Sequence, residues 1–229
     1  MRSKPVSIQN KDIFKAIHRS QHCQRNWDLD VGIPQEDIDT VIEAITQCPS
    51  KQNKNFYNIH LLQDRETIEK LHDMTKGFGL ADTSVTTNSQ TLAHLCIVFE
   101  AVNTEKMIQQ FYRNLTVSNG TYNSIDWDNH TPDPQLWSSC ESDVQRDQHM
   151  AVGIAAGYAN ITGSLLGYGT GCCACFDEQG IKDLLNLEEQ PLLIMGIGVP
   201  GNKPRRVHHL DDSIKFPTIG KAPIAVKVH

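Results

Sequence analysis

Two apolar runs constrain the fold of this chain more than any other feature. Residues 92–101, LAHLCIVFEA, and residues 191–200, PLLIMGIGVP, are nearly continuous stretches of apolar side chains. Such runs indicate strands covered on both faces, because a strand with one solvent face alternates apolar and polar residues. The chain must therefore place helices on both sides of a central sheet.

Helical spacing of apolar residues supplies that cover. The predicted helices span residues 11–19, 33–50, 65–76, 141–166 and 177–187. Further strands are predicted over 56–64 and, as a half-buried edge strand, over 221–228, with a Gly-rich turn over 167–176. The fold class is therefore α+β, with three layers and a central mixed sheet flanked by helices. We expect one domain over 1–229, with a lid-like irregular insertion around 101–140.

Composition excludes several classes of protein. The net charge of −6 and the pI near 5.9 argue against a nucleic-acid binder, which needs cations to neutralise phosphates. No apolar run approaches the ~20 residues of a membrane-spanning helix. The first residues lack the apolar stretch of a signal peptide, and the cysteines are odd in number, at seven. Both features predict a reducing, cytoplasmic location rather than a disulfide framework.

Two polar clusters lie in the first quarter of the chain. His18, Arg19 and Ser20 end the first helix, and two guanidinium groups plus a hydroxyl would suit a phosphate if Arg25 joins them. The alternative is a solvated helix end, where cations are favoured anyway. The loop Pro49–Asn55 offers the amides and hydroxyl that recognition of a planar heterocycle requires, but it could equally be an ordinary turn.

Two further clusters lie in the last third. Alternate glycines in 167–171 allow a backbone to approach a ligand closely, and Cys172 and Cys175 form a CxxC. That CxxC could be a redox dithiol, or half of a metal site completed by His208 and His209, although packing is the commonest role of small clustered thiols. The basic cluster in 203–206 follows a strand and could meet a phosphate or simply face solvent.

Together and in this order, the four clusters resemble the FMN-dependent nitroreductase family. The resemblance covers nearly the whole chain and implies that FMN is bound by residues of every cluster. The candidate FMN-binding residues are His18, Arg19, Ser20, Arg25, Pro49, Ser50, Lys51, Gln52, Asn53, Asn55, Asn88, Cys172, Cys173, Ala174, Cys175, Lys203, Arg205 and Arg206. The second cation of the family's first motif is either His22 or Arg25, and Lys51 could be the cation that faces the flavin pyrimidine.

The resemblance also implies an activity. NAD(P)H would deliver hydride to flavin N5, and the reduced flavin would then reduce an electron-poor acceptor, such as a nitroaromatic compound or a quinone, in a ping-pong sequence. The backbone N–H of Ala174 would face N5, and the enzyme would be a homodimer with FMN at the interface. The alternatives are a flavin enzyme of this fold with other chemistry (dehalogenation, desaturation or flavin cleavage) and a thiol redox or metal-binding protein.

The long segment between the second apolar strand and the long helix predicts a substrate lid. Irregular connections of this length are uncommon and often functional. Its aromatic residues are expected to cover the flavin and shape the acceptor pocket; they include Phe111, Tyr112, Trp127 and Trp137.

Overall fold

The computed structural model describes residues 9–75, 88–107, 134–201, 206–208, 211–215 and 221–227. Its helices are α1 (Asn10–Ser20), α2 (Gln35–Thr46), α3 (Arg65–Asp73), α5 (Pro134–Leu166) and α6 (Glu178–Leu185), and its short 3₁₀ turns are η1 (Lys51–Asn53) and η2 (Ser89–Leu92). Its strands are β1 (Tyr57–Leu62), β2 (Leu95–Ala101), β3 (Gly169–Cys173), β4 (Pro191–Gly198), β5 (Arg206–His208) and β6 (Asp211–Lys215).

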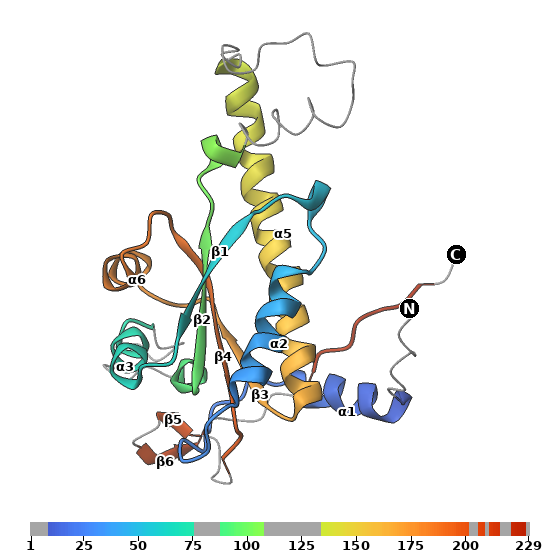
Figure 1. Ribbon diagram of the computed structural model, residues 1–229, viewed down its shortest axis with the longest axis vertical. Coiled ribbons are helices and arrows are strands. Elements are labelled where there is room, and N and C mark those ends of the chain that lie inside the picture. Colours follow the sequence, from blue (N-terminus) through green and yellow to red (C-terminus); the bar gives the residue numbers. More distant parts are fainter. Residues whose placement is uncertain are drawn as a thin grey trace.

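Four strands form the central sheet in the order β1-β2-β4-β3 (Figure 1). The strands β5 and β6 pair separately. The predicted α+β class with helices on both faces of one sheet is confirmed. One detail differs from the prediction of a mixed sheet, because all three pairings between the described strands of this sheet are antiparallel. A buried apolar run does not reveal strand direction, so the sequence could not settle this point.

The strand β2 supplies side chains to both faces of the sheet. Leu95, Ile97 and Phe99 pack in the core that includes α2 and α5, whereas Cys96 and Val98 pack in the core that includes α3 and α6. Successive side chains of a strand point to opposite faces, so one continuous apolar run serves two cores. This explains the uninterrupted apolar pattern of the run.

The helices α1, α2, α3 and α6 confirm the predicted ones with small changes at their ends. The apolar face predicted for α2 is confirmed, since Ile38, Val41 and Ile45 are buried. Each of α3 and α6 begins after an aspartate, Asp64 or Asp177, whose carboxylate accepts the backbone N–H three residues later. Such caps satisfy donors that the first helical turn leaves unpaired.

The Gly-rich segment predicted as a turn is the strand β3. Gly169 and Gly171 pair with Gly198 and Gly196 of β4. A Cβ at Gly169 would lie 2.8 Å from Cγ of Gln24. The glycines therefore make room for chain segments that cross close to the strand, and this requirement mimics a turn signal in the sequence.

The long helix α5 begins earlier than predicted, at Pro134 rather than near residue 141. Proline is favoured in the first helical turn because its missing N–H has no partner there. Residues 104–107 and 134–140 of the predicted irregular segment 101–140 are thus helical, and residues 108–133 lie outside the described residues. Within the described residues, no helix has both the length and the apolarity to cross a membrane.

The predicted edge strand at 221–228 is wrong in this structure. Residues 221–227 form no strand, and Ile224 and Val226 are 77% and 86% exposed. A strand needs a neighbouring strand for its backbone hydrogen bonds, and this segment has none among the described residues.

Candidate functional site

A polar cluster at the end of α1 is tied to two neighbouring elements. Nη1 of Arg19 donates to the carbonyl of Ser164 on α5 at 3.0 Å. The carbonyl of Ser20 accepts from Nδ2 of Asn160 on α5 at 3.4 Å. Oδ1 of Asn160 in turn accepts from the hydroxyl of Thr170 on β3. The last turn of α1 is therefore fixed by α5 and β3, with His18 and Arg19 left exposed.

The connection from α5 to β3 runs close to this cluster. Gly167 has φ of 104°, in the left-handed region that favours glycine. A Cβ at this position would lie 3.7 Å from Nη1 of Arg19. The other N–H groups of the Arg19 guanidinium have no hydrogen-bond partner within the described part of the chain, so they can bind an anion.

At the other end of β3, the backbone emerges at the surface. Ala174 and Cys175 are exposed, whereas Cys173 before them and Phe176 after them are buried. The carbonyl of Cys175 accepts from Nδ2 of Asn88 at 3.3 Å. The predicted residues Asn88, Cys172, Cys173, Ala174 and Cys175 are thus brought together, and the exposed backbone at Ala174 is anchored on both sides.

Arg25 lies with η2. Its Nη1 donates to Oε1 of Gln90 at 2.7 Å. With Arg65 and Trp27 it also lines a pocket of about 160 Å³. Among the described residues, the structure thus pairs this predicted cation with a buried amide.

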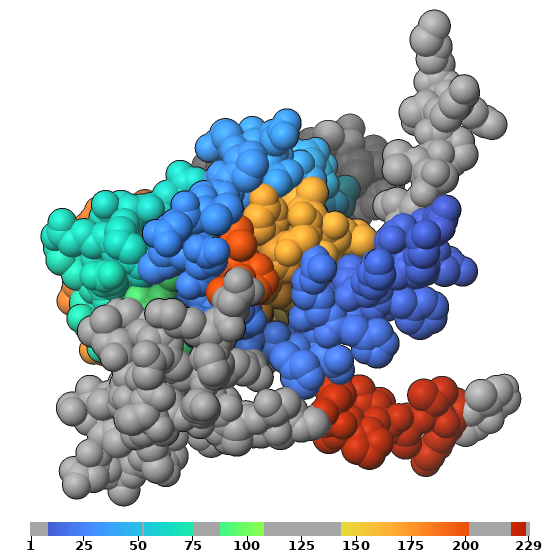
Figure 2. Space-filling model, turned by 90° about the horizontal axis from the view of Figure 1, so that it is seen from below, coloured from blue at the N-terminus to red at the C-terminus, as the bar shows by residue number. Residues whose placement is uncertain are grey.

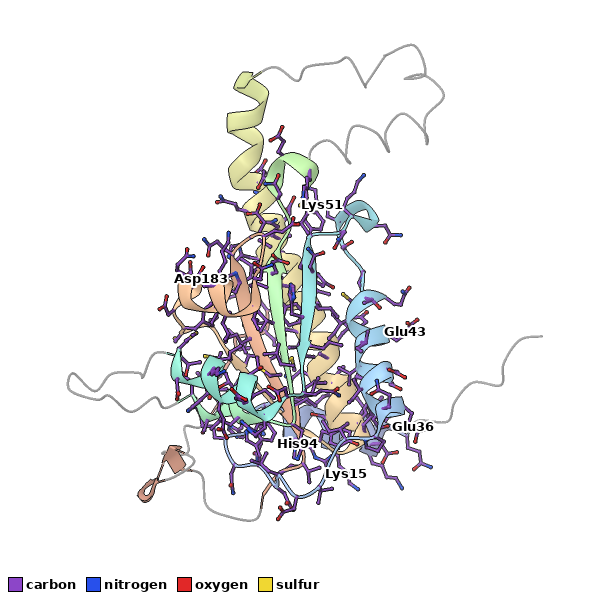
Figure 3. The ribbon with its side chains drawn as sticks, turned by 60° about the vertical axis from the view of Figure 1, so that its left-hand side comes forward. Lys15, Glu36, Glu43, Lys51, His94 and Asp183 are labelled. Atoms are coloured by element: carbon purple, nitrogen blue, oxygen red, sulfur yellow. The ribbon has the colours of Figure 1, made fainter. Side chains whose placement is uncertain are left out.

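The Pro49–Asn55 loop lies at the other end of the molecule. Figure 3 shows Lys51 far from Lys15 of α1. Nζ of Lys51 lies 2.5 Å from Oδ2 of the buried Asp147, so Lys51 ties the loop to α5. Ser50, Asn53 and Asn55 line a pocket of about 500 Å³ beside the start of β1. One chain therefore does not bring this loop to Arg19.

Several predicted site residues carry no structural description. Lys203, Arg205, Phe111, Tyr112 and Trp127 lie outside the described residues, and so does His209. Of Gln52, Trp137, Arg206 and His208 only the backbone is described, in η1, α5 and β5. Their predicted roles stay predictions.

The sequence did not point to Gln90, Asn160 and Asp147, whose side chains bond to predicted site residues or to the backbone next to them. Gln90 and Asp147 are buried, and Asn160 is half-buried. A polar residue next to a strand or within a helix is usually exposed, so its burial follows only from the tertiary fold. The one available signal was position, since Gln90 lies two residues before the apolar run 92–101.

The raised pKa values of Cys172 and Cys173 keep these two thiols protonated at neutral pH. Burial is the largest cause that raises the pKa of Cys172 to about 12 and that of Cys173 to about 11, and neighbouring thiols add to both shifts. The six cysteines whose side chains the structure describes are free thiols. Within the described ranges, no group of three or more His, Cys, Asp or Glu residues could hold a metal ion. A neutral thiol is a poor nucleophile and metal ligand, which disfavours the alternative built on Cys172 and Cys175.

We expect alkylation of the native protein at pH 7 to modify Cys175 well before Cys172 or Cys173. Cys175 is exposed, whereas the raised pKa values keep the other two thiols neutral. Because the pKa of Cys172 is raised, its alkylation should accelerate with each step of pH toward about 12. Mass spectrometry of tryptic peptides after timed iodoacetamide treatment measures this order. Equal rates at Cys172 and Cys175 at pH 7 would contradict it.

The chain matches the family model described as the nitroreductase family over residues 19–199. The match covers well over half of the chain. By fold and family match, the protein is an oxidoreductase enzyme. It belongs to the nitroreductase family, as the four clusters predicted.

Solved structures show the same fold at low sequence identity. They include a protein assigned as the nitroreductase ydfN of Bacillus subtilis, with 16% identity, coverage of 94% of this chain and 97% of that chain, and a TM-score of 0.65. A protein of Staphylococcus epidermidis assigned as an NAD(P)H:FMN oxidoreductase has 17% identity, coverage of 93% and 95%, and a TM-score of 0.59. An FMN-dependent nitroreductase of Clostridium difficile has 16% identity, coverage of 89% and 91%, and a TM-score of 0.54. No curated protein matches the chain.

Proposed function

We propose that this enzyme uses FMN to pass a hydride from NAD(P)H to an electron-poor acceptor, such as a nitroaromatic compound or a quinone. The observation that carries the proposal is the pair of exposed residues Ala174 and Cys175 after β3, where a side-chain amide holds the carbonyl of Cys175. The assignments of the Staphylococcus and Clostridium relatives to FMN chemistry support it.

The donors near β3 fit the chemical groups of FMN. Arg19 presents an exposed guanidinium, whose fork of N–H groups suits phosphate oxygens. Asn88 lies beside Ala174 and Cys175, where its amide nitrogen donates to the carbonyl of Cys175 and its amide oxygen accepts from Gln90, so it supports this segment from behind. The small side chain of Ala174 leaves its backbone open to a flat ring.

Each of these groups has a separate task. When bound, FMN supplies the hydride chemistry, so the protein needs no nucleophile of its own. Arg19 and Ser20, with Arg205 and either Lys203 or Arg206, would hold the phosphate. The N–H of Ala174 would donate toward N5 and draw electron density from it, which would favour arrival of a hydride.

A steady-state assay tests the proposed activity. The purified protein, reconstituted with FMN, is supplied with NADH or NADPH and a panel of quinones, nitroaromatic compounds and halogenated aromatics. We expect oxidation of the nicotinamide to depend on FMN and on a quinone or nitro compound. Turnover with the halogenated compounds alone would instead favour the alternative chemistry on this fold.

We also propose that the enzyme is a homodimer with FMN at the interface. Met150, Ile154, Tyr158 and Leu165 of α5 are 52%, 41%, 43% and 42% exposed. Their spacing places them on one face of the helix. Figure 2 shows the C-terminal part of α5 at the surface between α1 and α2. An apolar stripe of this kind on a soluble chain marks an interface.

A dimer also accounts for the separation of the predicted FMN ligands. In one chain, the Pro49–Asn55 loop lies far from the α1 cluster (Figure 3). We propose that the loop of the partner subunit reaches the site built by Arg19 and Ala174. Each site would then draw its phosphate ligands from one chain and part of its ring contacts from the other.

Replacing Ile154 with glutamate is expected to weaken the dimer by about a hundredfold or more, because a charge would be buried at the interface. Sedimentation equilibrium measures the dimer, and a parallel FMN titration should show that the cofactor is lost with it. The matched control is Val31→Glu, at an exposed apolar position in the loop before α2. An Ile154→Glu protein that stays dimeric would contradict the proposed interface.

The proposed location is the cytoplasm, where reduced thiols persist. The free state of the six described cysteines supports this. The negative net charge supports small molecules, rather than nucleic acids, as partners.

A further inference from the structure

A chain of three polar side chains lies against the backbone of residues 172–175. Nη1 of Arg25 donates to Oε1 of Gln90 at 2.7 Å. Nε2 of Gln90 donates to the carbonyl of Cys172 at 3.2 Å and to Oδ1 of Asn88 at 3.3 Å. Nδ2 of Asn88 donates to the carbonyl of Cys175 at 3.3 Å. These linked side chains thus bond to two backbone carbonyls, of Cys172 and Cys175, which lie on either side of the N–H of Ala174 along the backbone.

These hydrogen bonds have one direction, which Arg25 sets at one end and the carbonyls of Cys172 and Cys175 set at the other. A side-chain amide can present either its oxygen or its nitrogen to a neighbour, whereas a guanidinium only donates. Arg25 therefore turns the oxygen of Gln90 toward itself and the nitrogen of Gln90 toward Cys172 and Asn88. The same rule then turns the nitrogen of Asn88 toward Cys175.

Packing holds the middle of the chain in place. Gln90 and Asn88 are 3% and 5% exposed. A Cβ at Gly171 of β3 would lie only 2.7 Å from Cβ of Gln90, so the strand has no side chain where η2 approaches it. The backbone of Arg25 is fixed as well, since its carbonyl accepts from the hydroxyl of Ser89 at 3.0 Å. Buried amides in such a setting have one favourable arrangement.

We propose that Arg25, Gln90 and Asn88 are positioning residues, which fix the backbone of Cys172–Cys175 and thereby the direction of the Ala174 N–H. This inference rests on the proposed function, in which that N–H faces flavin N5. Gln90 touches neither FMN nor substrate in this account and acts only through the backbone. Arg25 is then assigned to this chain of side chains rather than to the FMN phosphate.

The test is Gln90→Met, which keeps the length of the side chain and changes no charge. In the FMN-free protein, hydrogen–deuterium exchange of the peptide covering residues 172–176 should become about tenfold faster. The Asn88 amide oxygen loses the Gln90 donor, and the Cys172 carbonyl keeps only the weaker thiol donor of Cys23 at 3.7 Å. In the FMN-loaded protein, the midpoint potential of the flavin should shift, because N5 is an acceptor only in the oxidised flavin and the N–H is no longer held toward it.

The matched control is Gln148→Met. Gln148 is equally buried, and its Nε2 donates to the carbonyl of Val102 at 2.5 Å, far from β3 along the chain. It should lose a comparable amount of stability without faster exchange at residues 172–176. Arg25→Lys adds a conservative variant, because an ammonium also only donates. We expect its exchange and potential to stay nearer to those of the wild type than those of Arg25→Met.

The outcomes separate this inference from the proposed function. Unchanged exchange at residues 172–176 in Gln90→Met would overturn the positioning role, whatever FMN does. Faster exchange with an unchanged flavin potential would overturn the link between this backbone and N5. Failure of the wild-type protein to bind FMN would overturn the proposed function, while the exchange result would still report on the positioning of the backbone.

Discussion

Replacing Arg19 with alanine is expected to weaken FMN binding about tenfold or more. A hydrogen bond to a charged group contributes about 1.5–3 kcal/mol, and about 1.4 kcal/mol corresponds to a factor of ten in affinity. Arg19 is exposed, and its Nη1 is anchored on Ser164. Arg205→Ala should have a similar effect if both cations meet the phosphate. Titration of the FMN-free protein, followed by quenching of flavin fluorescence, measures both affinities.

Two controls make this result specific. Lys70→Ala removes an exposed cation of α3 that pairs with Glu66, and it should leave the FMN affinity unchanged. Thermal unfolding of the FMN-free Arg19→Ala protein shows whether loss of the bond to Ser164 has released α1. If Arg19→Ala and Arg205→Ala both bind FMN as tightly as the wild type, the phosphate site lies elsewhere.

Replacing Ala174 with proline is expected to slow flavin reduction by about a hundredfold. Proline lacks the backbone N–H that we propose donates to N5. Removal of one fixed donor to a developing charge typically slows a reaction by about a hundredfold. Ala174→Ser retains the N–H on an exposed residue and should have a mild effect. Stopped-flow measurement of flavin bleaching by NAD(P)H compares the two variants.

The comparison is valid only for protein that holds FMN. Proline also restricts φ, so the FMN occupancy of each variant must be measured before its reduction rate is interpreted. Equal rates in FMN-loaded Ala174→Pro and Ala174→Ser would show that the N–H of Ala174 does not assist the hydride.

The two central strands were the most predictable part of the fold. Their apolar runs had to be covered on both faces, and β2 and β4 are indeed packed between helices. The helix α2 was predictable for a similar reason, since the spacing of Ile38, Val41 and Ile45 reports burial directly. In each case the apolar residues of a single element are enough to predict which of its faces are buried.

Other elements depended on contacts that no local pattern records. The glycines of β3 accommodate Gln24 and Gln90, which are distant in sequence, and they imitate a turn. The tail at 221–227 alternates like an edge strand, yet a strand also needs a partner. Such features follow from the tertiary arrangement, so the sequence alone predicted them incorrectly.

The candidate site divides in the same way. Arg19 and Ser20 sit at the end of a predictable helix. Ala174 follows the unpredicted strand β3, and only motif order pointed to it. Gln90 and Asn160 act from inside, through hydrogen bonds to residues far away in the sequence. A buried amide produces no periodic pattern in the sequence, because its contribution to the structure depends on the hydrogen-bond partner that the tertiary fold brings to it.

The most direct test of the account is the visible absorbance of the purified protein, mixed with FMN and separated from the free cofactor. We predict that the flavin bands remain with the protein and bleach when NADH or NADPH is added without oxygen. They should return when a quinone or a nitroaromatic compound follows. A protein that retains no flavin, or retains a flavin that neither nicotinamide bleaches, would contradict the proposed activity.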